Sequence, residues 1–279
     1  MKKVLITGSG GFIGGNLKEA FKNKFSLLCP RSFELDLTDK TAVQKYFRDN
    51  TIDFIIHCAS TGGERGVEDG PSTVEDNLSM LNNLLESKKE ETRMVLFGSG
   101  AMYDRFRELH KVREEEIGGF IPKELYGEAK MRLAQKIQNR EDCVCLNIFG
   151  CYGKNEKLSR FPSYAISQNL KKQPIIINQN VVFDYLYIDD LIKIVEFLMF
   201  NKPKYNILNA TPTESISLLK IAEIINEISG FKSEIIIKNE KMNYEYTGDN
   251  SRLTEILPSF KFTSYKEGLT KLFNYLKAL

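Results

Sequence analysis

The chain has 279 residues, enough to bury a large core in one domain or in a domain with a smaller lobe. Its 39 basic and 37 acidic side chains nearly cancel, so its charge gives no reason to expect a nucleic-acid or membrane partner. The start of the chain leads straight into an apolar strand, and no apolar run approaches the ~20 residues of a membrane span. The five cysteines have no zinc-ligand spacing. We therefore expect a cytoplasmic protein with reduced cysteines and no metal site.

The first predicted elements are a strand, a glycine turn and a helix. Residues 4–7 form an apolar run, and apolar residues at helical spacing begin at Phe12. Gly8 can adopt backbone angles closed to other residues, Gly11 lets the main chain approach a pyrophosphate, and Gly14 lets the helix pack on the strand. An ordinary glycine-rich turn is the alternative, but a helix N-terminus beside a buried strand favours phosphate binding. The expected dinucleotide contacts are Gly8, Gly10, Gly11, Phe12, Ile13 and Gly14.

The spacing Thr7-Gly8-x-x-Gly11-x-x-Gly14 resembles the extended short-chain dehydrogenase/reductase family, which binds NAD or NADP. The resemblance implies an α/β fold: a Rossmann-type doubly wound parallel sheet with a small C-terminal substrate-binding lobe. It implies an NAD(P)-binding Rossmann domain over residues 1–152, with return elements from about 181–209. The lobe is expected over residues 153–279, interleaved with the first domain.

The second strand, expected over residues 25–29, bears on the choice of cofactor. It ends at a proline without the acidic residue that binds the ribose 2′-hydroxyl in NAD-specific sites. Arg31 follows, and it could accommodate a 2′-phosphate or be a solvated loop cation. NADP(H) is therefore favoured, and NAD(H) is the alternative. The next segment, Leu-Asp-Leu-Thr-Asp, resembles nucleotide-sugar 4-ketoreductases such as GDP-fucose synthase, which implies cofactor contacts by Asp36 and Leu37.

Residues 53–60 predict a central parallel strand, which ends in small residues where such a strand would meet the cofactor. Its His57 is expected to be a core histidine rather than a base, because nothing nearby suggests an orienting carboxylate. The loop over residues 61–71 has four glycines and is expected to lie over the cofactor. Asn77, in the following helix, is a surface residue or, as the resemblance implies, a support for the cofactor and catalytic lysine. The family resemblance also implies cofactor contacts by Cys58, Ala59 and Ser60.

The catalytic prediction depends on three residues. Tyr126 and Lys130 are four residues apart on a predicted helix, so their polar ends share one face. Tyrosine is a poor base at neutral pH, and an adjacent cation favours its phenolate form. Ser99, after the predicted strand 94–97, could hydrogen-bond the substrate oxygen beside the tyrosine. The resemblance makes Ser99, Tyr126 and Lys130 the catalytic set, with Tyr126 and Lys130 also on the cofactor.

The segment after Ser99 departs from the family pattern. Gly100 and Ala101 follow the serine, and we expect these three residues at the substrate. Sugar 4,6-dehydratases carry an Asp-Glu pair there, so its absence argues against dehydration. GDP-fucose synthase uses a cysteine and a histidine for epimerisation where this chain has Ala101 and about Ser159, which argues against epimerisation at two carbons.

Later elements are predicted with fewer functional residues. We expect helices over residues 159–172 and 218–228, a strand over 205–209, and a helix capped by Asp189 or Asp190. Three family positions are replaced, at Asn147, Gly150 and Phe183. The expected contacts with a diphosphate, for which solvated cations are the alternative, are Arg160 and Arg252.

These residues predict NADP(H)-dependent reduction of a 4-keto nucleotide sugar in bacterial-type surface-polysaccharide synthesis. One alternative is an NAD-dependent nucleotide-sugar 4-epimerase that uses the same residues, and a second is a non-catalytic NADP-sensing protein. The partner is expected to be a nucleotide-diphosphate sugar. The resemblance also implies a homodimer through the apolar faces of the helices that carry Asn77 and Tyr126.

Overall fold

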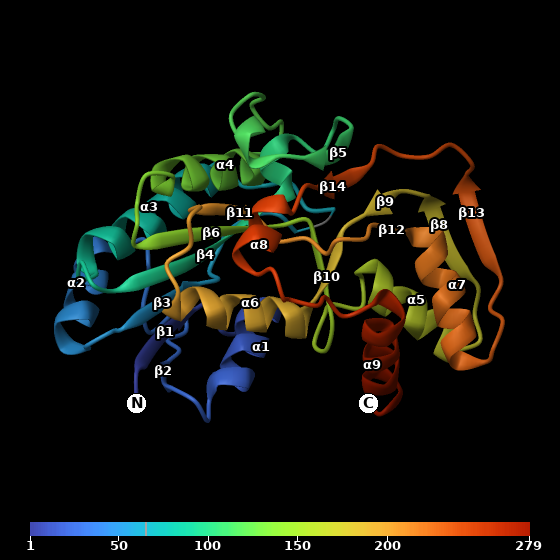
Figure 1. Ribbon diagram of the computed structural model, residues 1–279, viewed down its shortest axis with the longest axis horizontal. Helices are drawn as coiled ribbons and strands as arrows, with labels where there is room; N and C mark the ends of the chain where they lie inside the picture. The colour runs from blue at the N-terminus through green and yellow to red at the C-terminus, as the bar shows by residue number, and fades with distance from the viewer. Residues whose placement is uncertain (65) are drawn as a thin grey trace.

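A six-stranded parallel sheet forms the larger part of the molecule (Figure 1). The computed structural model describes residues 1–64 and 66–279. The strand order is β11-β6-β4-β3-β1-β2, and every pair is parallel. The strands are β1 (Lys3–Thr7), β2 (Ser26–Leu28), β3 (Phe54–His57), β4 (Arg93–Ser99), β6 (Cys143–Ile148) and β11 (Ile207–Asn209).

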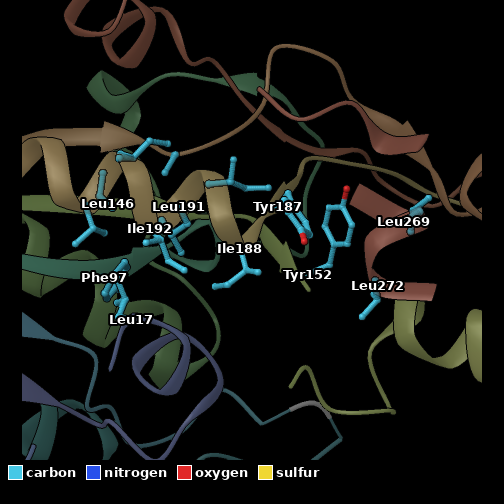
Figure 2. Close-up of a cluster of buried hydrophobic side chains, with 14 of the residues drawn as sticks. Leu17, Phe97, Leu146, Tyr152, Tyr187, Ile188, Leu191, Ile192, Leu269 and Leu272 are labelled. Atoms are coloured by element: carbon cyan, nitrogen blue, oxygen red, sulfur yellow. The ribbon is translucent and has the colours of Figure 1, made fainter. Parts of the chain in front are cut away.

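Helices cover both faces of this sheet (Figure 1). Successive strand residues point to opposite faces, so Val4 and Ile6 join one buried cluster while Leu5 joins another. Figure 2 shows the first cluster between the sheet, α1 and α6, continuing through Tyr152 to Leu269 in the lobe. This confirms the doubly wound α/β fold. One face carries α1 (Phe12–Phe21) and α6 (Ile188–Phe200), and the other carries α2 (Lys40–Asp49), α3 (Thr73–Ser87) and α4 (Leu125–Ile137).

The sheet reverses its winding between β1 and β3, which are neighbours. Ligands of open α/β sheets bind at such a switch point, beyond the carboxyl ends of the strands. The sheet ends at β2, because residues 32–38 form turns rather than a further strand. Leu35 and Leu37 of this segment are buried against the core under α2 and α3.

The C-terminal lobe contains a small mixed sheet of order β12-β9-β14-β5. Its strand β5 comes from the first half of the chain and pairs with β14, so this small sheet joins a segment that follows β4 to the C-terminal part of the chain. The members are β5 (Leu109–Val112), β9 (Val182–Phe183), β12 (Ile216–Ser217) and β14 (Tyr246–Gly248). Two parallel pairs add β7 (Gly150–Tyr152) with β10 (Tyr185–Tyr187), and β8 (Ile175–Gln179) with β13 (Ile235–Asn239). The remaining helices are α5 (Phe161–Leu170), α7 (Leu218–Ser229), α8 (Ser251–Ile256) and α9 (Tyr265–Lys277), with short 3-10 turns η1 (Gly100–Tyr103) and η2 (Glu114–Glu116).

The N-terminus of α6 differs from the prediction. The predicted cap of α6 by Asp189 or Asp190 is wrong, because the helix begins at Ile188 and both aspartates lie inside its first turn. Asp190 instead accepts hydrogen bonds from the backbone N–H of Thr263 at 2.6 Å and from the Thr263 hydroxyl at 2.9 Å. It therefore ties α6 to the segment that precedes α9.

The five cysteines are free thiols, and two of them are fully buried. Across residues 1–64 and 66–279, no helix is both long and apolar enough to span a bilayer. The same residues contain no group of three or more His, Cys, Asp and Glu side chains arranged to hold a metal ion.

Candidate active site

The glycine turn between β1 and α1 lies against the end of β3. Gly8 has φ +64°, and a Cβ there would lie 2.6 Å from the backbone N of Ala59. A Cβ on Gly14 would lie 2.4 Å from the carbonyl oxygen of Gly8, so α1 packs directly on the turn. Gly11 is the N-cap of α1, and its N–H donates to Gly8 O at 3.0 Å. The conformational roles predicted for Gly8 and Gly14 are confirmed, and their contact with a dinucleotide stays a prediction.

Arg31 extends over this turn. A Cβ on Gly10 would lie 3.1 Å from Arg31 Cζ, so the guanidinium sits beside the glycine loop. In the part of the chain described, no carboxylate forms an ion pair with this guanidinium within 4.0 Å, and Glu34 accepts the backbone N–H of Arg31 instead. Asp36 is exposed, and hydrogen bonds from Thr38 lower the pKa of its carboxyl. Arg31 therefore has a free charge at the place where an adenosine phosphate would lie in a Rossmann site.

The end of β3 is fixed by two polar side chains. Thr7 Oγ1 accepts the N–H of Ala59 at 3.1 Å and lies 2.8 Å from His57 Nδ1. Burial, with a smaller effect from Lys130, lowers the pKa of His57 to about 3, so the ring is neutral and the expectation of a core histidine is confirmed. Cys58, the next residue, is half-buried, and burial raises the pKa of its thiol.

Asn77 is 1% exposed, which excludes the alternative of a surface asparagine. Its amide oxygen accepts from Ser60 Oγ at 2.9 Å, and its Nδ2 donates to Thr61 O at 3.0 Å. A third contact ties it to Thr73 O at 2.7 Å within α3. Asn77 therefore supports the loop that follows β3, and a contact with the cofactor stays a prediction.

Ser99 and Tyr126 lie where β4 ends and α4 begins. Ser99 Oγ accepts the N–H of Ala101 at 3.2 Å, which caps η1. A Cβ on Gly127 would lie 2.6 Å from Ala101 O, so the first turn of α4 packs closely on the residues after Ser99. Lys130 is 5% exposed, its Nζ donates to Phe97 O at 2.9 Å, and it lies 5.4 Å from the centroid of the Tyr126 ring. The structure thus brings the three predicted catalytic residues to one edge of the sheet.

The loop after β3 holds Tyr126 from the other side. A Cβ on Gly63 would lie 2.8 Å from three atoms of the Tyr126 ring, so the loop backbone rests on the phenol. Asp69 joins the two segments: its Oδ1 accepts from Gly63 N and its Oδ2 from Tyr126 N, both at 2.8 Å. Sequence reasoning missed Asp69, because nothing in its surroundings marks it as a cap for a helix that starts far along the chain.

A family model for the NAD dependent epimerase/dehydratase family matches residues 4–210. The chain belongs to this family. GDP-L-colitose synthase of Yersinia pseudotuberculosis is 25% identical over 268 residues, which cover 86% of each chain. The family and its NAD(P)-dependent chemistry agree with the expectation from the glycine, serine and tyrosine motifs.

Solved structures show the same fold. GDP-mannoheptose C4 reductase from Campylobacter jejuni, with NADP bound, superimposes with a TM-score of 0.83 at 20% identity, over 99% of this chain and 98% of that chain. UDP-glucose 4-epimerase from Thermotoga maritima superimposes with a TM-score of 0.80 at 18% identity, over 99% of each chain. The fold is therefore shared by reductases and epimerases, and the choice between them rests on the residues of the site.

The replaced family positions have structural explanations here. Asn147, in place of an arginine, is completely buried and bonds Asn209 Oδ1 at 3.1 Å and Tyr103 Oη at 3.3 Å. Phe183, in place of another arginine, stacks on Tyr185 with ring centroids 5.2 Å apart. These side chains contribute packing and internal hydrogen bonds where the family has cations.

The two arginines expected at a diphosphate differ in placement. Arg160 is the N-cap residue of α5, and its positive charge favours the ionised form of the Glu64 and Glu156 carboxyls. Arg252 pairs with Glu115 at 2.5 Å, and it lies beside the start of β11 whereas Ser99 lies at the end of β4. The structure does not bring Arg252 to the predicted catalytic residues, because acidic residues of η2 hold it at the edge of the sheet. The contacts of Arg160 and Arg252 with a diphosphate stay predictions.

Proposed function

We propose that this chain reduces a 4-keto nucleotide sugar with NADPH. The observation that carries the proposal is the convergence of Ser99, Tyr126 and Lys130 beside a glycine turn with the free cation of Arg31 over it. The named relatives support it, since both GDP-L-colitose synthase and GDP-mannoheptose C4 reductase act on GDP-linked sugars. A synthetic route to surface polysaccharide is the proposed setting.

The residues of the turn fit a dinucleotide. A side chain would not fit at Gly8 or Gly14. Gly11 is the N-cap residue of α1, so it would let a pyrophosphate approach the N-terminus of this helix. Arg31, with Asp36 and Leu37 nearby in sequence, would hold the adenosine end, while Ala59, Ser60 and Lys130 would hold the nicotinamide end. NADPH, when bound, supplies a hydride to the carbonyl carbon.

The proton and the hydrogen bonds for the carbonyl oxygen would come from Tyr126, Lys130 and Ser99. Tyr126 donates its phenolic proton to that oxygen, and the Lys130 ammonium stabilises the negative charge that develops on the phenol. Lys130 is held for this task by Phe97 O. Ser99 donates a hydrogen bond to the same oxygen and keeps it beside Tyr126.

The proposed function is tested by incubating the purified protein with 4-keto nucleotide sugars and NADPH. Reduction is measured as the loss of NADPH absorbance. Tyr126→Phe should lower kcat by about 100-fold or more, because it removes the proton donor and keeps the ring. Turnover unchanged by this substitution would overturn the catalytic assignment. Absence of binding to all four nicotinamide dinucleotides would overturn the reading of the glycine turn.

Arg31→Ala is the test of cofactor choice. We expect NADPH affinity to fall about tenfold or more while NADH affinity stays within about twofold, because the guanidinium would pair with the 2′-phosphate. Arg48→Ala, which removes an exposed cation from the end of α2, is the control and should change neither affinity. Equal losses of affinity for NADPH and NADH would show that Arg31 does not select NADPH.

The second candidate function is a nucleotide-sugar 4-epimerase, favoured by the fold shared with the Thermotoga maritima enzyme. An epimerase returns the hydride to the same substrate, so it would keep NAD bound through purification and show no net oxidation of NADPH. A non-catalytic NADP sensor is less well supported, because it would need none of Ser99, Tyr126 and Lys130.

We also propose a cytoplasmic homodimer through α3 and α4. The apolar face of α4 is turned into the core, so its outer face offers the Glu128–Arg132 ion pair rather than the expected apolar contact. The apolar contribution would come from α3, where Leu78 and Leu85 are half-buried. Light scattering on the wild type and on Leu78→Glu tests the dimer, and a monomeric wild type would exclude it.

A further inference from the structure

The 3-10 turn η1 lies between the predicted catalytic serine and the start of α4. Ser99 is the N-cap residue of η1, and its Oγ accepts the N–H of Ala101 at 3.2 Å. A Cβ on Gly127 would lie 2.6 Å from Ala101 O, so η1 also touches the first turn of α4, beside Tyr126. The separation between Ser99 and Tyr126 therefore depends on where η1 is held.

Tyr103, the last residue of η1, connects the turn to the two strands beside β4. Asn147 of β6 pairs with Gly98 of β4, and a Cβ on Gly98 would overlap Asn147 Oδ1. Asn147 Nδ2 donates to Tyr103 Oη at 3.3 Å, and Tyr103 Oη donates to Asn209 Oδ1 of β11 at 2.8 Å. The chain from Gly98 to Tyr103 is thus tied at its far end to β6 and β11.

These contacts are removed from water. Asn147 and Asn209 are completely buried, and Tyr103 is 1% exposed. The Tyr103 ring stacks on Phe149, with centroids 5.9 Å apart and planes 21° from parallel. Burial raises the pKa of Tyr103 well above its usual value, so the phenol keeps the proton that it donates. A buried polar network whose members are all bonded favours one rigid arrangement.

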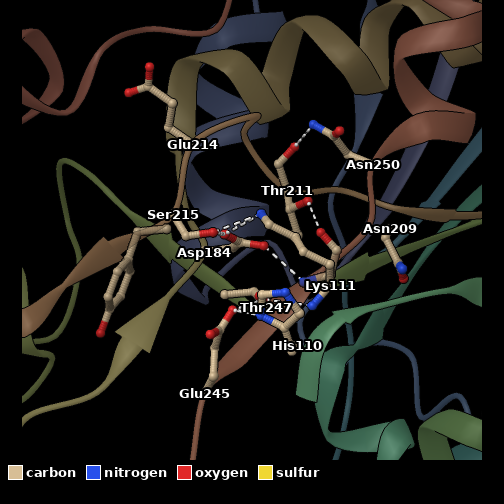
Figure 3. Close-up of polar contacts among 12 residues, drawn as sticks. His110, Lys111, Asp184, Asn209, Thr211, Glu214, Ser215, Glu245, Thr247 and Asn250 are labelled. Atoms are coloured by element: carbon tan, nitrogen blue, oxygen red, sulfur yellow. Dashed lines mark hydrogen bonds and ion pairs between the residues drawn. The ribbon is translucent and has the colours of Figure 1, made fainter. Parts of the chain in front are cut away.

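Asn209 is itself fixed on several sides. Its N–H donates to Glu114 Oε1 at 2.7 Å, and its Nδ2 donates to Val112 O at 2.9 Å. Figure 3 shows the neighbouring contact, in which Asn250 Nδ2 donates to Thr211 O at 3.0 Å. The carboxyl end of β11 is therefore joined to β5, η2 and the start of α8, and it gives Tyr103 a fixed partner.

The residue after η1 indicates that the turn needs such a partner. Asp104 is 8% exposed and has φ +64°, a conformation that residues with a side chain rarely adopt. Its N–H donates to Ala101 O at 3.1 Å, which closes the turn. A conformation of this kind persists where the surrounding structure holds it. The bonded phenol of Tyr103 fixes the chain immediately before this point.

We propose that Tyr103 is a positioning residue, whose hydrogen bond to Asn209 holds η1 in place and thereby fixes Ser99 relative to Tyr126. Because its side chain is buried, Tyr103 acts through Ser99 rather than on the substrate. The catalytic part of this inference rests on the proposed reduction. The structural part, the anchoring of η1, can be measured without any substrate.

The structural part is tested by hydrogen exchange, measured by mass spectrometry on peptides that cover residues 99–104. Tyr103→Phe removes the hydroxyl and keeps the ring, while Asn209 Oδ1 still accepts from Asn147 Nδ2 at 3.1 Å, so the variant should fold. The amides of these peptides should exchange about threefold faster or more, the change expected from the loss of one hydrogen bond. Unchanged exchange would overturn the proposal.

Two further variants make the exchange measurement specific. Thr92→Val, the matched control, removes a buried hydrogen bond of the same length, from Thr92 Oγ1 to Ile52 O at 2.8 Å, beside the amino end of β4. It should leave the exchange of residues 99–104 unchanged, and equal acceleration there would mean that general destabilisation is the cause. Asn209→Ala removes the acceptor and should reproduce the faster exchange. If Asn209→Ala does not, Tyr103 does not act through Asn209 and the proposal is wrong.

The catalytic part is tested by a double-mutant cycle. Tyr103→Phe should lower kcat about fivefold with KM within about twofold, because the position of Ser99 is lost and the substrate contacts stay. In a Ser99→Ala background the same substitution should change kcat by less than about twofold. Equal losses in both backgrounds would show that Tyr103 acts independently of Ser99, against the proposal. Thr92→Val should leave kcat within about twofold.

The two parts separate the possible failures. A wild type that reduces no 4-keto sugar contradicts the proposed function, whereas hydrogen exchange still decides whether Tyr103 anchors η1. Faster exchange together with unchanged kcat in Tyr103→Phe would contradict the positioning role while leaving the reduction intact.

Discussion

Gly14 shows how little space separates α1 from the glycine turn. A Cβ at Gly14 would lie 2.4 Å from Gly8 O, and backbone atoms cannot yield as a side chain can. Gly14→Ala should lower the free energy of unfolding by about 2 kcal/mol, even though alanine favours a helix by ~1 kcal/mol over glycine. NADPH affinity should fall as well, because the turn must shift. Urea unfolding and cofactor titration measure the two effects.

The neighbouring glycine is the matched control. A Cβ at Gly15 would lie 3.5 Å from Ser9 O, an ordinary contact distance. Gly15→Ala should leave stability unchanged or raise it by about 0.5–1 kcal/mol. If Gly14→Ala and Gly15→Ala lower the free energy of unfolding equally, the close contact between Gly14 and Gly8 O is not the cause of the loss.

Residues whose role depends on local spacing could be predicted from the sequence. The glycine turn and the Tyr126–Lys130 pair depend on spacing along one element, so the pattern alone identifies them. Asp69 could not be found in this way, since it reaches Tyr126 from a segment that is distant in sequence. The ion pairs of Arg252 could not be predicted for the same reason, because its acidic partners in η2 come close to it only after folding.

The orientation of α4 depends on a residue outside it. Its N-cap residue, Glu124, makes no side-chain cap, whereas Asp69 accepts the N–H of Tyr126 at 2.8 Å. Asp69→Ala should lower the free energy of unfolding by about 1 kcal/mol, the usual cost of losing a cap. It should also lower kcat about tenfold, because both α4 and the loop under Tyr126 lose a fixed point. Denaturant unfolding and steady-state kinetics measure these effects.

The cap of α9 offers a comparison remote from the site. Ser264 Oγ accepts the N–H of Glu267 at 3.3 Å, so Ser264→Ala removes a cap of the same kind. Ser264→Ala should lower the free energy of unfolding by about as much as Asp69→Ala and should leave kcat unchanged. If both variants lower kcat in proportion to stability, Asp69 has only a structural role.

Elements of the large sheet were predictable, and most of the lobe was not. Central parallel strands are continuous apolar runs and their helices are amphipathic, so residues 4–7 and 94–97 identify β1 and β4. Strands β9 and β12 have two residues each, too few for any periodicity. Their sheet also combines four separate segments of the chain, which spacing within one segment cannot reveal.

The seam between the large sheet and the lobe contains a buried carboxyl. Glu156 follows β7, and its neighbour Lys154 accepts a hydrogen bond through its carbonyl oxygen from Asn16 of α1 at 3.0 Å. Glu156 is 7% exposed, and its Oε2 accepts from Ser163 Oγ of α5 at 2.6 Å. Burial, the largest effect, raises the pKa of Glu156 to about 8. The proton on this carboxyl therefore matters for how the two parts of the molecule are held together.

The sign of the pH dependence follows from where the proton is bound. Between pH ~4.5 and ~8 the folded chain keeps a proton on Glu156 that the unfolded chain releases, so stability falls as pH rises through this window. Glu156→Gln should abolish this component, because glutamine can still bond Ser163 and does not titrate. At pH 8 and above the variant should exceed the wild type in free energy of unfolding by on the order of 5 kcal/mol.

Urea unfolding of both proteins across this pH range separates Glu156 from every other titrating group, because only the difference between the two curves is used. That difference should grow with pH up to about 8 and then stay constant. Glu240→Gln, at an exposed glutamate in the lobe, should give a curve parallel to that of the wild type. A difference that does not change with pH would mean that Glu156 is ionised in the folded protein, and the seam would then be held by a charge rather than by a neutral carboxyl.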